Sequence, residues 1–122
     1  MADWQDVASI ALARPDVEEG TSYGNRAWKV KGKLFVWERP LRRKEVEALG
    51  GFEPDGAAPT GDILGVRVPD EGAKRALVES EPDIYFTTPH FDGHPSVLIR
   101  LDRIGRPDLE EAIVEAWHCR RD

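Results

Sequence analysis

The chain has 122 residues, of which 40% are hydrophobic and 33% are charged, and its formal net charge is −6. This balance is typical of one soluble globular domain spanning residues 1–122, and it excludes a disordered chain. No apolar run approaches the roughly 18 residues that a membrane helix needs. A single cysteine and an acidic N-terminus, unlike a basic secretory signal, lead us to expect a cytoplasmic protein.

The first 24 residues are expected to contain one helix. Residues 3–13 carry apolar side chains at helical spacing, and Pro15 ends that pattern. Residues 16–20 are interpreted as an acidic connector, and residues 21–24 as a short strand or a turn.

Residues 26–39 are predicted to form a β-hairpin with Lys31-Gly32 as a two-residue loop. The expected cross-strand pairs are Val30 with Lys33, Trp28 with Phe35, and Arg26 with Trp37. This register places Trp28 and Trp37 on one face, where aromatic cross-strand pairs stabilise a sheet. A three-residue loop would exchange the two faces.

The remaining elements alternate between helices and strands. A helix is expected over 40–49, a surface loop over 50–61, a strand over 62–68, a helix capped by Asp70, strands over 83–88 and 96–102, and a last helix from Pro107. The expected fold class is therefore α+β: one compact domain with an antiparallel sheet and helices at both chain ends.

The negative net charge hides a basic segment. Its eight cations are Arg26, Lys29, Lys31, Lys33, Arg39, Arg42, Arg43 and Lys44. Only Glu38 opposes them, so residues 26–44 carry +7 and the rest of the chain carries −13. Such a stripe is the footprint expected for binding a polyanion. The interpretation favoured for the charge run itself is a solvated hairpin rim whose lysines protect a strand edge from aggregation, because such runs usually face water.

The four tryptophans divide into two pairs. Helical spacing assigns Trp4 and Trp117 to the core. Trp28 and Trp37 interleave with basic residues, a pattern in which aromatic rings stack on bases while cations contact phosphates. The same two rings are also expected to form one wall of the core, and this second interpretation is favoured.

No set of residues indicates a catalytic or metal site. His90, Asp92 and His94 are residue types that bind metals, but the surrounding prolines and glycine favour a turn between strands. Cys119 and His118 are adjacent on a helix and therefore point about 100° apart, so they do not form a dyad. We accordingly expect no enzyme activity, no metal and no cofactor.

Several segments together resemble a known family. They are Arg14-Pro15-Asp16-Val17-Glu18-Glu19, the hairpin 28–36, Tyr85-Phe86-Thr87-Thr88-Pro89-His90, Val97-Leu98-Ile99-Arg100-Leu101-Asp102 and the helix 108–120. Over nearly its whole length the chain resembles the MmcQ/YjbR family of small bacterial proteins. The resemblance implies an α+β fold similar to the frataxin (CyaY-like) class, sometimes described as a double wing. It also implies DNA binding by fold analogy, with the hairpin 26–39 as the natural wing.

The chain departs from this family in one loop. Many members have a His-Met-Asn-Lys-like stretch where this chain has His90-Phe91-Asp92-Gly93. The asparagine and the lysine are missing, which weakens any anion contact that the resemblance would assign to that loop.

Two functional hypotheses follow. In the leading one the chain is a DNA-binding module with largely sequence-independent affinity, and the cations between Arg26 and Lys44 contact phosphates. In the alternative it is a non-enzymatic domain that binds a protein or a small molecule, and its hairpin merely happens to be basic. The acidic remainder favours the alternative, because it repels DNA everywhere except at one face.

Overall fold

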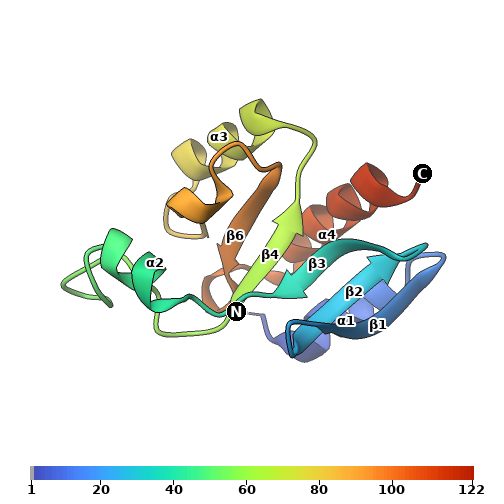
Figure 1. Cartoon of the computed structure of the whole chain (residues 1–122). Helices are drawn as coiled ribbons and strands as arrows, with labels where there is room; N and C mark the ends of the chain where they lie inside the picture. Colours follow the sequence, from blue (N-terminus) through green and yellow to red (C-terminus); the bar gives the residue numbers. More distant parts are fainter. Residues whose placement is uncertain (1) are drawn as a thin grey trace.

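The computed structural model describes residues 2–122, which form a six-stranded antiparallel sheet with helices around it (Figure 1). In chain order the strands are β1 (Val17–Ser22), β2 (Asn25–Val30), β3 (Lys33–Glu38), β4 (Ile63–Arg67), β5 (Tyr85–Phe86) and β6 (Ser96–Arg100). The strand order across the sheet is β1-β2-β3-β4-β6-β5.

Four α-helices and two short 3₁₀ turns complete the fold. They are α1 (Trp4–Leu12), α2 (Arg43–Ala48), α3 (Glu71–Ser80), η1 (Pro89–Phe91), η2 (Leu101–Arg103) and α4 (Arg106–Arg120). The α+β class, the antiparallel sheet and the helices at both chain ends are confirmed. Within residues 2–122, no helix has the length and apolar character needed to cross a membrane.

The larger part of the core lies between one face of the sheet and the helices α1 and α4. Val7 of α1 and Ile113 of α4 are fully buried there, and Trp28 of β2 is buried with them. Trp4 stacks on Trp28 with 6.3 Å between ring centroids and 14° between planes. The expectation that Trp4 and Trp117 pack in the core is confirmed.

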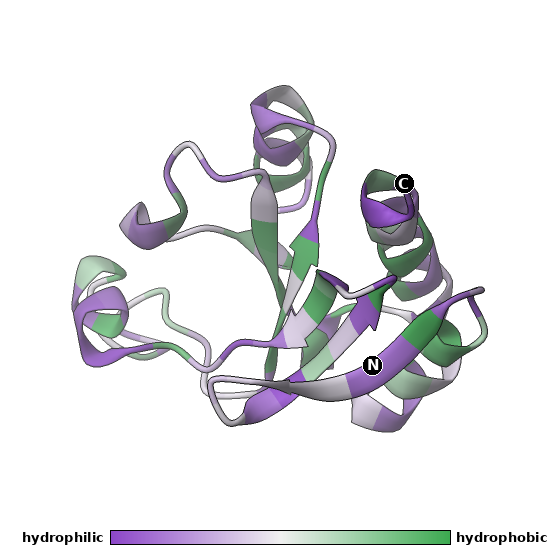
Figure 2. Cartoon of the chain, turned by 45° about the vertical axis from the view of Figure 1, so that its right-hand side comes forward, coloured by the Kyte–Doolittle hydropathy of each residue, from purple (hydrophilic) through white to green (hydrophobic). Residues whose placement is uncertain are grey.

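A second, smaller cluster covers the other face of the sheet. It joins Trp37, Phe86 and Leu98 from the strands to Phe91 of η1, and Leu41 packs against it from the segment before α2. Because short segments rather than long helices cover these residues, this face leaves room for the cleft described below. Figure 2 shows the apolar stretches along β4, β6 and α4.

The hairpin loop is as expected. Lys31 and Gly32 both have positive φ, 51° and 79°, which fits a two-residue loop whose backbone twist matches the strands. Val30 is paired with Lys33, which confirms the first predicted pair.

Beyond that first pair, the predicted register is wrong. The structure pairs Trp28 with Val36 and Ala27 with Trp37, in place of Trp28 with Phe35 and Arg26 with Trp37. Phe35 is an extra residue in β3, because Lys29 is paired with Leu34 while Trp28 is paired with Val36. As a result Trp28 and Trp37 lie in the two different hydrophobic clusters, on opposite faces of the sheet.

The interpretation of residues 16–20 as a connector is also wrong. Asp16 does lie in a turn, but residues 17–20 belong to β1, an edge strand that pairs along β2 and places Glu18 opposite Lys29. Glu19 forms an ion pair with Arg26, with 3.1 Å between the carboxylate oxygen and Nε. Acidic residues disfavour strands intrinsically, but the basic partner strand compensates for that preference here.

Gly65 is required by the position of Trp37. The two residues are paired across β3 and β4, and a Cβ on Gly65 would lie 2.7 Å from Cζ2 and Nε1 of the indole. We expect Gly65→Ala to lower the free energy of unfolding by about 2 kcal/mol, because the ring must shift within a packed cluster. Urea unfolding followed by tryptophan fluorescence measures the change.

Gly20→Ala is the matched control, because Gly20 also lies in a strand but an added Cβ meets nothing within 4 Å. Its stability should stay within about 0.5 kcal/mol of the wild type. Equal urea midpoints for Gly65→Ala and the wild type would contradict the close contact.

Candidate functional site

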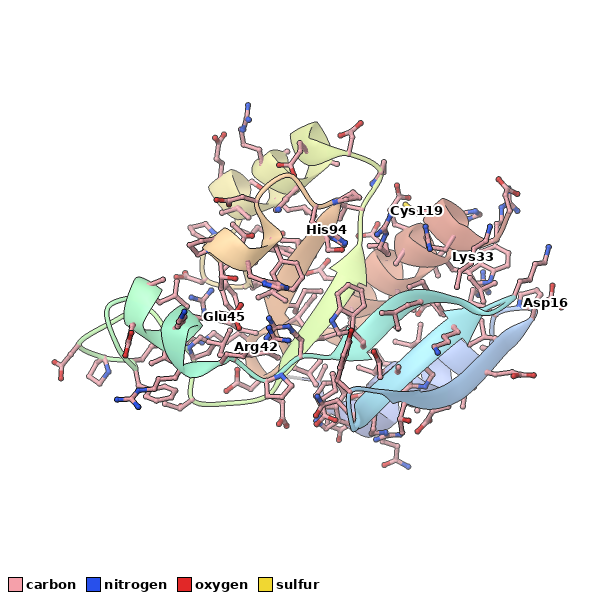
Figure 3. All side chains as sticks on the ribbon, viewed as in Figure 1. Asp16, Lys33, Arg42, Glu45, His94 and Cys119 are labelled. Carbon is pink, nitrogen blue, oxygen red and sulfur yellow. The ribbon has the colours of Figure 1, made fainter. Side chains whose placement is uncertain are left out.

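The eight basic residues of 26–44 do not form one surface. Lys31 and Lys33 lie at the hairpin tip, whereas Arg42 directly precedes α2, beyond the opposite end of β3. Figure 3 shows this separation: Lys33 lies beside Asp16 at one end of the molecule, and Arg42 lies beside Glu45 towards the other. The sequence stripe is therefore divided into two groups by the length of a strand.

Charges at the hairpin are largely opposed. The Arg26 guanidinium is bound to Glu19 and lies 5.1 Å from the Trp28 ring centroid. Lys29 faces Glu18 across the strands, and the Lys33 ammonium donates to the backbone carbonyl of Asp122. The acidic strand β1 thus offsets much of the positive charge of the hairpin.

Arg39 is buried in an ion pair. Its Nη1 and Nη2 donate to the two carboxylate oxygens of Glu45 at 2.8 and 3.0 Å. The Thr88 hydroxyl donates to the same carboxylate at 2.6 Å, and the Arg42 backbone amide donates at 3.0 Å. This cluster joins the end of β3, the start of α2 and the segment before η1, so Arg39 serves as a structural cation.

The same contacts set the acidity of Glu45. Burial alone would raise the pKa of this carboxyl, but hydrogen bonds from Thr88, from the Arg42 amide and from Arg39 hold it below its usual range. Glu45 is therefore ionised at neutral pH, and its charge stabilises the fold only while it remains so.

A cleft of about 580 Å³ lies on the face of the sheet that carries Trp37. Trp37 and Phe91 are buried beneath it, and Tyr23, 96% exposed, stands at its rim. The cationic or imidazole side chains that line it are Arg39, Arg42, Arg67, Arg120, His90 and His94. Among the described residues lining this cleft, Glu38 is the only carboxylate, and it accepts from the backbone amide of Arg26.

Three of these side chains gather where β4, α4 and the loop before β6 meet. Burial lowers the pKa of Arg67, and the nearby charge of Arg120 lowers it further. Burial likewise lowers the pKa of His94, and Arg67, Lys74, His90 and Arg120 add to the effect. Neither Arg67 nor Arg120 forms an ion pair within the part of the chain that the structure describes.

The cleft continues into a second hollow of about 430 Å³ over α2. Arg42 and His90 line both hollows, and Arg43 and Lys44 line the second. We call the resulting row of side chains the basic track; it consists of Arg120, Arg67, His94, His90, Arg42, Arg43 and Lys44. Three of the eight cations singled out in the sequence therefore belong to it, and the other five do not.

The histidine loop, which we define as residues 90–94, lines the cleft with its two imidazoles and with Phe91. His90 and His94 flank Phe91 edge to face, with ring centroids 5.0 and 5.9 Å away. Asp92 instead borders a separate hollow beside Lys74. Across residues 2–122, no three His, Cys, Asp or Glu side chains cluster in a way that suits a metal ion.

Lys74 fixes this loop in place. Its ammonium is buried and donates to the carbonyls of Phe91 at 2.5 Å and His94 at 3.0 Å. A charged donor between two backbone carbonyls holds the loop on α3, so the two imidazoles face the cleft from a fixed position.

Arg67 and Arg120 were not among the residues singled out in the sequence. Arg67 ends an apolar strand, and Arg120 lies in the last helical turn, where positive charge also suits the helix dipole. The alternation in residues 62–68 does place Arg67 on the same face as Gly65, opposite Val66. Only the tertiary structure brings Arg120, at the C-terminal end of α4, to the cleft beside Arg67.

Replacing Glu45 with glutamine tests the buried cluster. Glu45→Gln leaves the buried Arg39 guanidinium without its countercharge, and we expect it to lower the free energy of unfolding by about 3 kcal/mol at pH 7. Because the folded-state pKa of Glu45 lies below its unfolded value near 4.5, the wild type should lose this advantage as the pH falls below about 4.5. Urea unfolding at several pH values measures both effects.

Glu47→Gln is the matched control on the same helix, since Glu47 forms only an exposed pair with Arg43 at 3.5 Å. It should change stability by less than about 0.5 kcal/mol at any pH. A gap between wild type and Glu45→Gln that stayed constant down to pH 3 would count against an ionised, stabilising Glu45.

Comparison with known proteins identifies the family. The family model described as YjbR matches residues 12–119. Uncharacterized protein Rv2570 of Mycobacterium tuberculosis is 54% identical over 119 residues, covering 96% of this chain and 87% of the relative.

The crystal structure of Deinococcus radiodurans protein DR2400, described as a DUF419 domain, superposes with a TM-score of 0.68 at 16% identity, over 96% of this chain and 77% of that one. A protein from Pseudomonas syringae superposes with a TM-score of 0.63 at 13% identity, over 93% and 95%. The two structures share the fold, and the family model together with the mycobacterial relative shows that the chain belongs to the YjbR family.

Proposed function

We propose that this protein is a non-enzymatic module that binds single-stranded nucleic acid, and that the strand lies along the basic track. The observation that carries the proposal is the row of cations facing the cleft, whose one lining carboxylate, Glu38, is bound to a backbone amide. Arg42, Arg67 and Arg120 form no ion pair within the described residues, and guanidinium groups of this kind at a concave surface favour an anionic ligand.

The shape of the site favours a single strand over a duplex. A concave cleft with aromatic side chains admits unpaired bases, and Tyr23 offers an exposed ring at the rim on which a base can stack. Duplex DNA is usually contacted by a protruding helix or β-ribbon that enters the major groove. On this chain the protruding ribbon is the hairpin tip, where β1 opposes the positive charge.

The charge distribution supports binding on one face only. A hollow between α3 and α4 is lined by four carboxylates, those of Glu81, Asp108, Glu111 and Glu115, and Arg67 lines both this hollow and the cleft. Such an acidic surface repels a polyanion and would orient a strand towards the basic track. The family resemblance also implies that the ligand is a nucleic acid. It assigns the contacts to the hairpin 26–39, however, whereas this proposal assigns them to the basic track.

The proposal includes no chemical step. Cys119 is half-buried, and burial raises the pKa of its thiol, so the group remains protonated and a poor nucleophile at neutral pH. A single thiol of this kind suits the reducing cytoplasm, in which we expect the protein to act.

Fluorescence anisotropy with labelled single-stranded and duplex oligonucleotides, across a salt series, tests the proposal. The variant Arg42→Ala/Arg43→Ala/Lys44→Ala removes three cations from the track, all of them exposed. We expect it to weaken single-strand binding at least tenfold and to reduce the salt slope by about 2, as three lost phosphate contacts require.

The charge-matched control is Lys29→Ala/Lys31→Ala/Lys33→Ala, which removes three cations from the hairpin and leaves the track intact. Single-strand binding by this variant should stay within about threefold of wild type, close to the effect of net charge alone. A large loss in this control together with no loss in the track variant would assign binding to the hairpin instead. Undetectable binding by the wild type at low salt would overturn the nucleic-acid role altogether.

A further inference from the structure

We propose that Arg67, Arg120 and His94 form a subsite for a phosphomonoester dianion, the terminal phosphate of a strand that lies in the cleft. The inference rests on the proposed function and adds to it the chemical group that is recognised. The three side chains come from the end of β4, the end of α4 and the loop before β6, and all three line the same cleft.

Unsatisfied polar atoms gather at this position. The Nε atoms of Arg67 and Arg120 are buried and have no hydrogen-bond partner, although both side chains line the cleft. The Ser96 hydroxyl, which is also buried without a partner, belongs to the residue paired with Arg67 across β4 and β6. Buried polar groups are normally hydrogen-bonded, so guanidinium groups left free in this way are suited to an incoming acceptor.

The mutual repulsion of these groups points to an anion. Arg120 lowers the proton affinity of Arg67, and both arginines do the same to His94. A folded chain that holds like charges together without a carboxylate between them gains energy when an anion binds among them. In the free protein the repulsion between these positive groups lowers stability, and a bound anion would remove that repulsion.

The number of positive groups favours a monoester over a diester. A phosphodiester within a strand carries one negative charge, whereas a terminal phosphate carries between 1.5 and 2 at pH 7 and offers three equivalent oxygen acceptors. Two guanidinium groups each present a fork of donors that matches two phosphate oxygens, and the His94 imidazole supplies a further N–H. The remaining positive residues of the track are separated along the surface and suit successive diesters.

Within residues 2–122, the contacts that explain the positions of other arginines are missing at Arg67 and Arg120. Arg39, Arg100, Arg103 and Arg106 each have carboxylate or carbonyl partners that explain their positions. Arg67 and Arg120 have none within the described chain, and neither guanidinium lies over an aromatic ring there.

The test compares 12-nucleotide single strands that share a sequence and carry a 5′-phosphate, a 3′-phosphate or hydroxyl groups at both ends. Anisotropy competition at fixed salt gives the Kd of each. We expect one phosphorylated strand to bind about tenfold more tightly than the hydroxyl strand, since charge-assisted contacts to one added phosphate supply that difference. Arg67→Gln and Arg120→Gln should each abolish the preference while leaving part of the affinity for the hydroxyl strand.

Arg121→Gln is the matched control, because it removes the arginine that directly follows α4, whose guanidinium carbon lies 5.3 Å from the Trp117 ring centroid and which does not line the cleft. It should keep the full preference. Thermal unfolding of each variant verifies folding, and Arg67→Lys, which retains the charge but loses the fork, should keep only part of the preference.

Each result separates the subsite from the wider proposal. Equal Kd values for all three strands in the wild type overturn the subsite and leave single-strand binding standing. A preference that persists in Arg67→Gln and Arg120→Gln also overturns the subsite. If no oligonucleotide binds but adenosine monophosphate shifts the His94 resonances in the wild type and not in Arg67→Gln, the phosphate subsite is supported and the nucleic-acid role fails.

Discussion

The extra residue in β3 is the constraint on which the site depends. With Phe35 unpaired, both Phe35 and Val36 pack into the core against α1 and α4, and Trp37 turns to the opposite face. The indole then lies across Gly65 and becomes the apolar floor of the cleft. A regular hairpin would have kept Trp37 in the main core and left the second face with Phe86 and Phe91 but without its tryptophan. One inserted residue therefore gives the sheet two packed faces of unequal depth.

Two clusters of buried, hydrogen-bonded polar groups hold the segments that cover the second face of the sheet. Glu45 binds Arg39, Thr88 and the Arg42 amide, and Lys74 binds the carbonyls of Phe91 and His94. Both clusters attach short segments that have little apolar surface of their own. These two polar clusters position the site. They hold α2 and the histidine loop on either side of the cleft, and this places the side chains of the basic track in one row.

The sequence predicted the large elements and missed the features that depend on pairing. Helical spacing and caps located α1, α3 and α4, and Lys31-Gly32 located the hairpin loop. The bulge at Phe35 has no signature in the local sequence. Strand β1 was not predicted because Glu18 and Glu19 favour a strand only beside the cations of β2. For the candidate site, Arg42, Arg43 and Lys44 were found from charge alone. Arg67 and Arg120, 53 positions apart, come together only through the packing of α4.

The acidic edge strand has a consequence for how the molecules meet one another. The outer side of β1 is the free edge of the sheet, with backbone groups available to another strand. Two copies that joined through this edge would bring the carboxylates of Glu18 and Glu19 from both chains together at strand spacing. Like charges placed directly opposite one another destabilise strand pairing, so this repulsion opposes growth of a continuous sheet. The charges that offset the hairpin within one molecule would thus also oppose edge-to-edge pairing of two molecules.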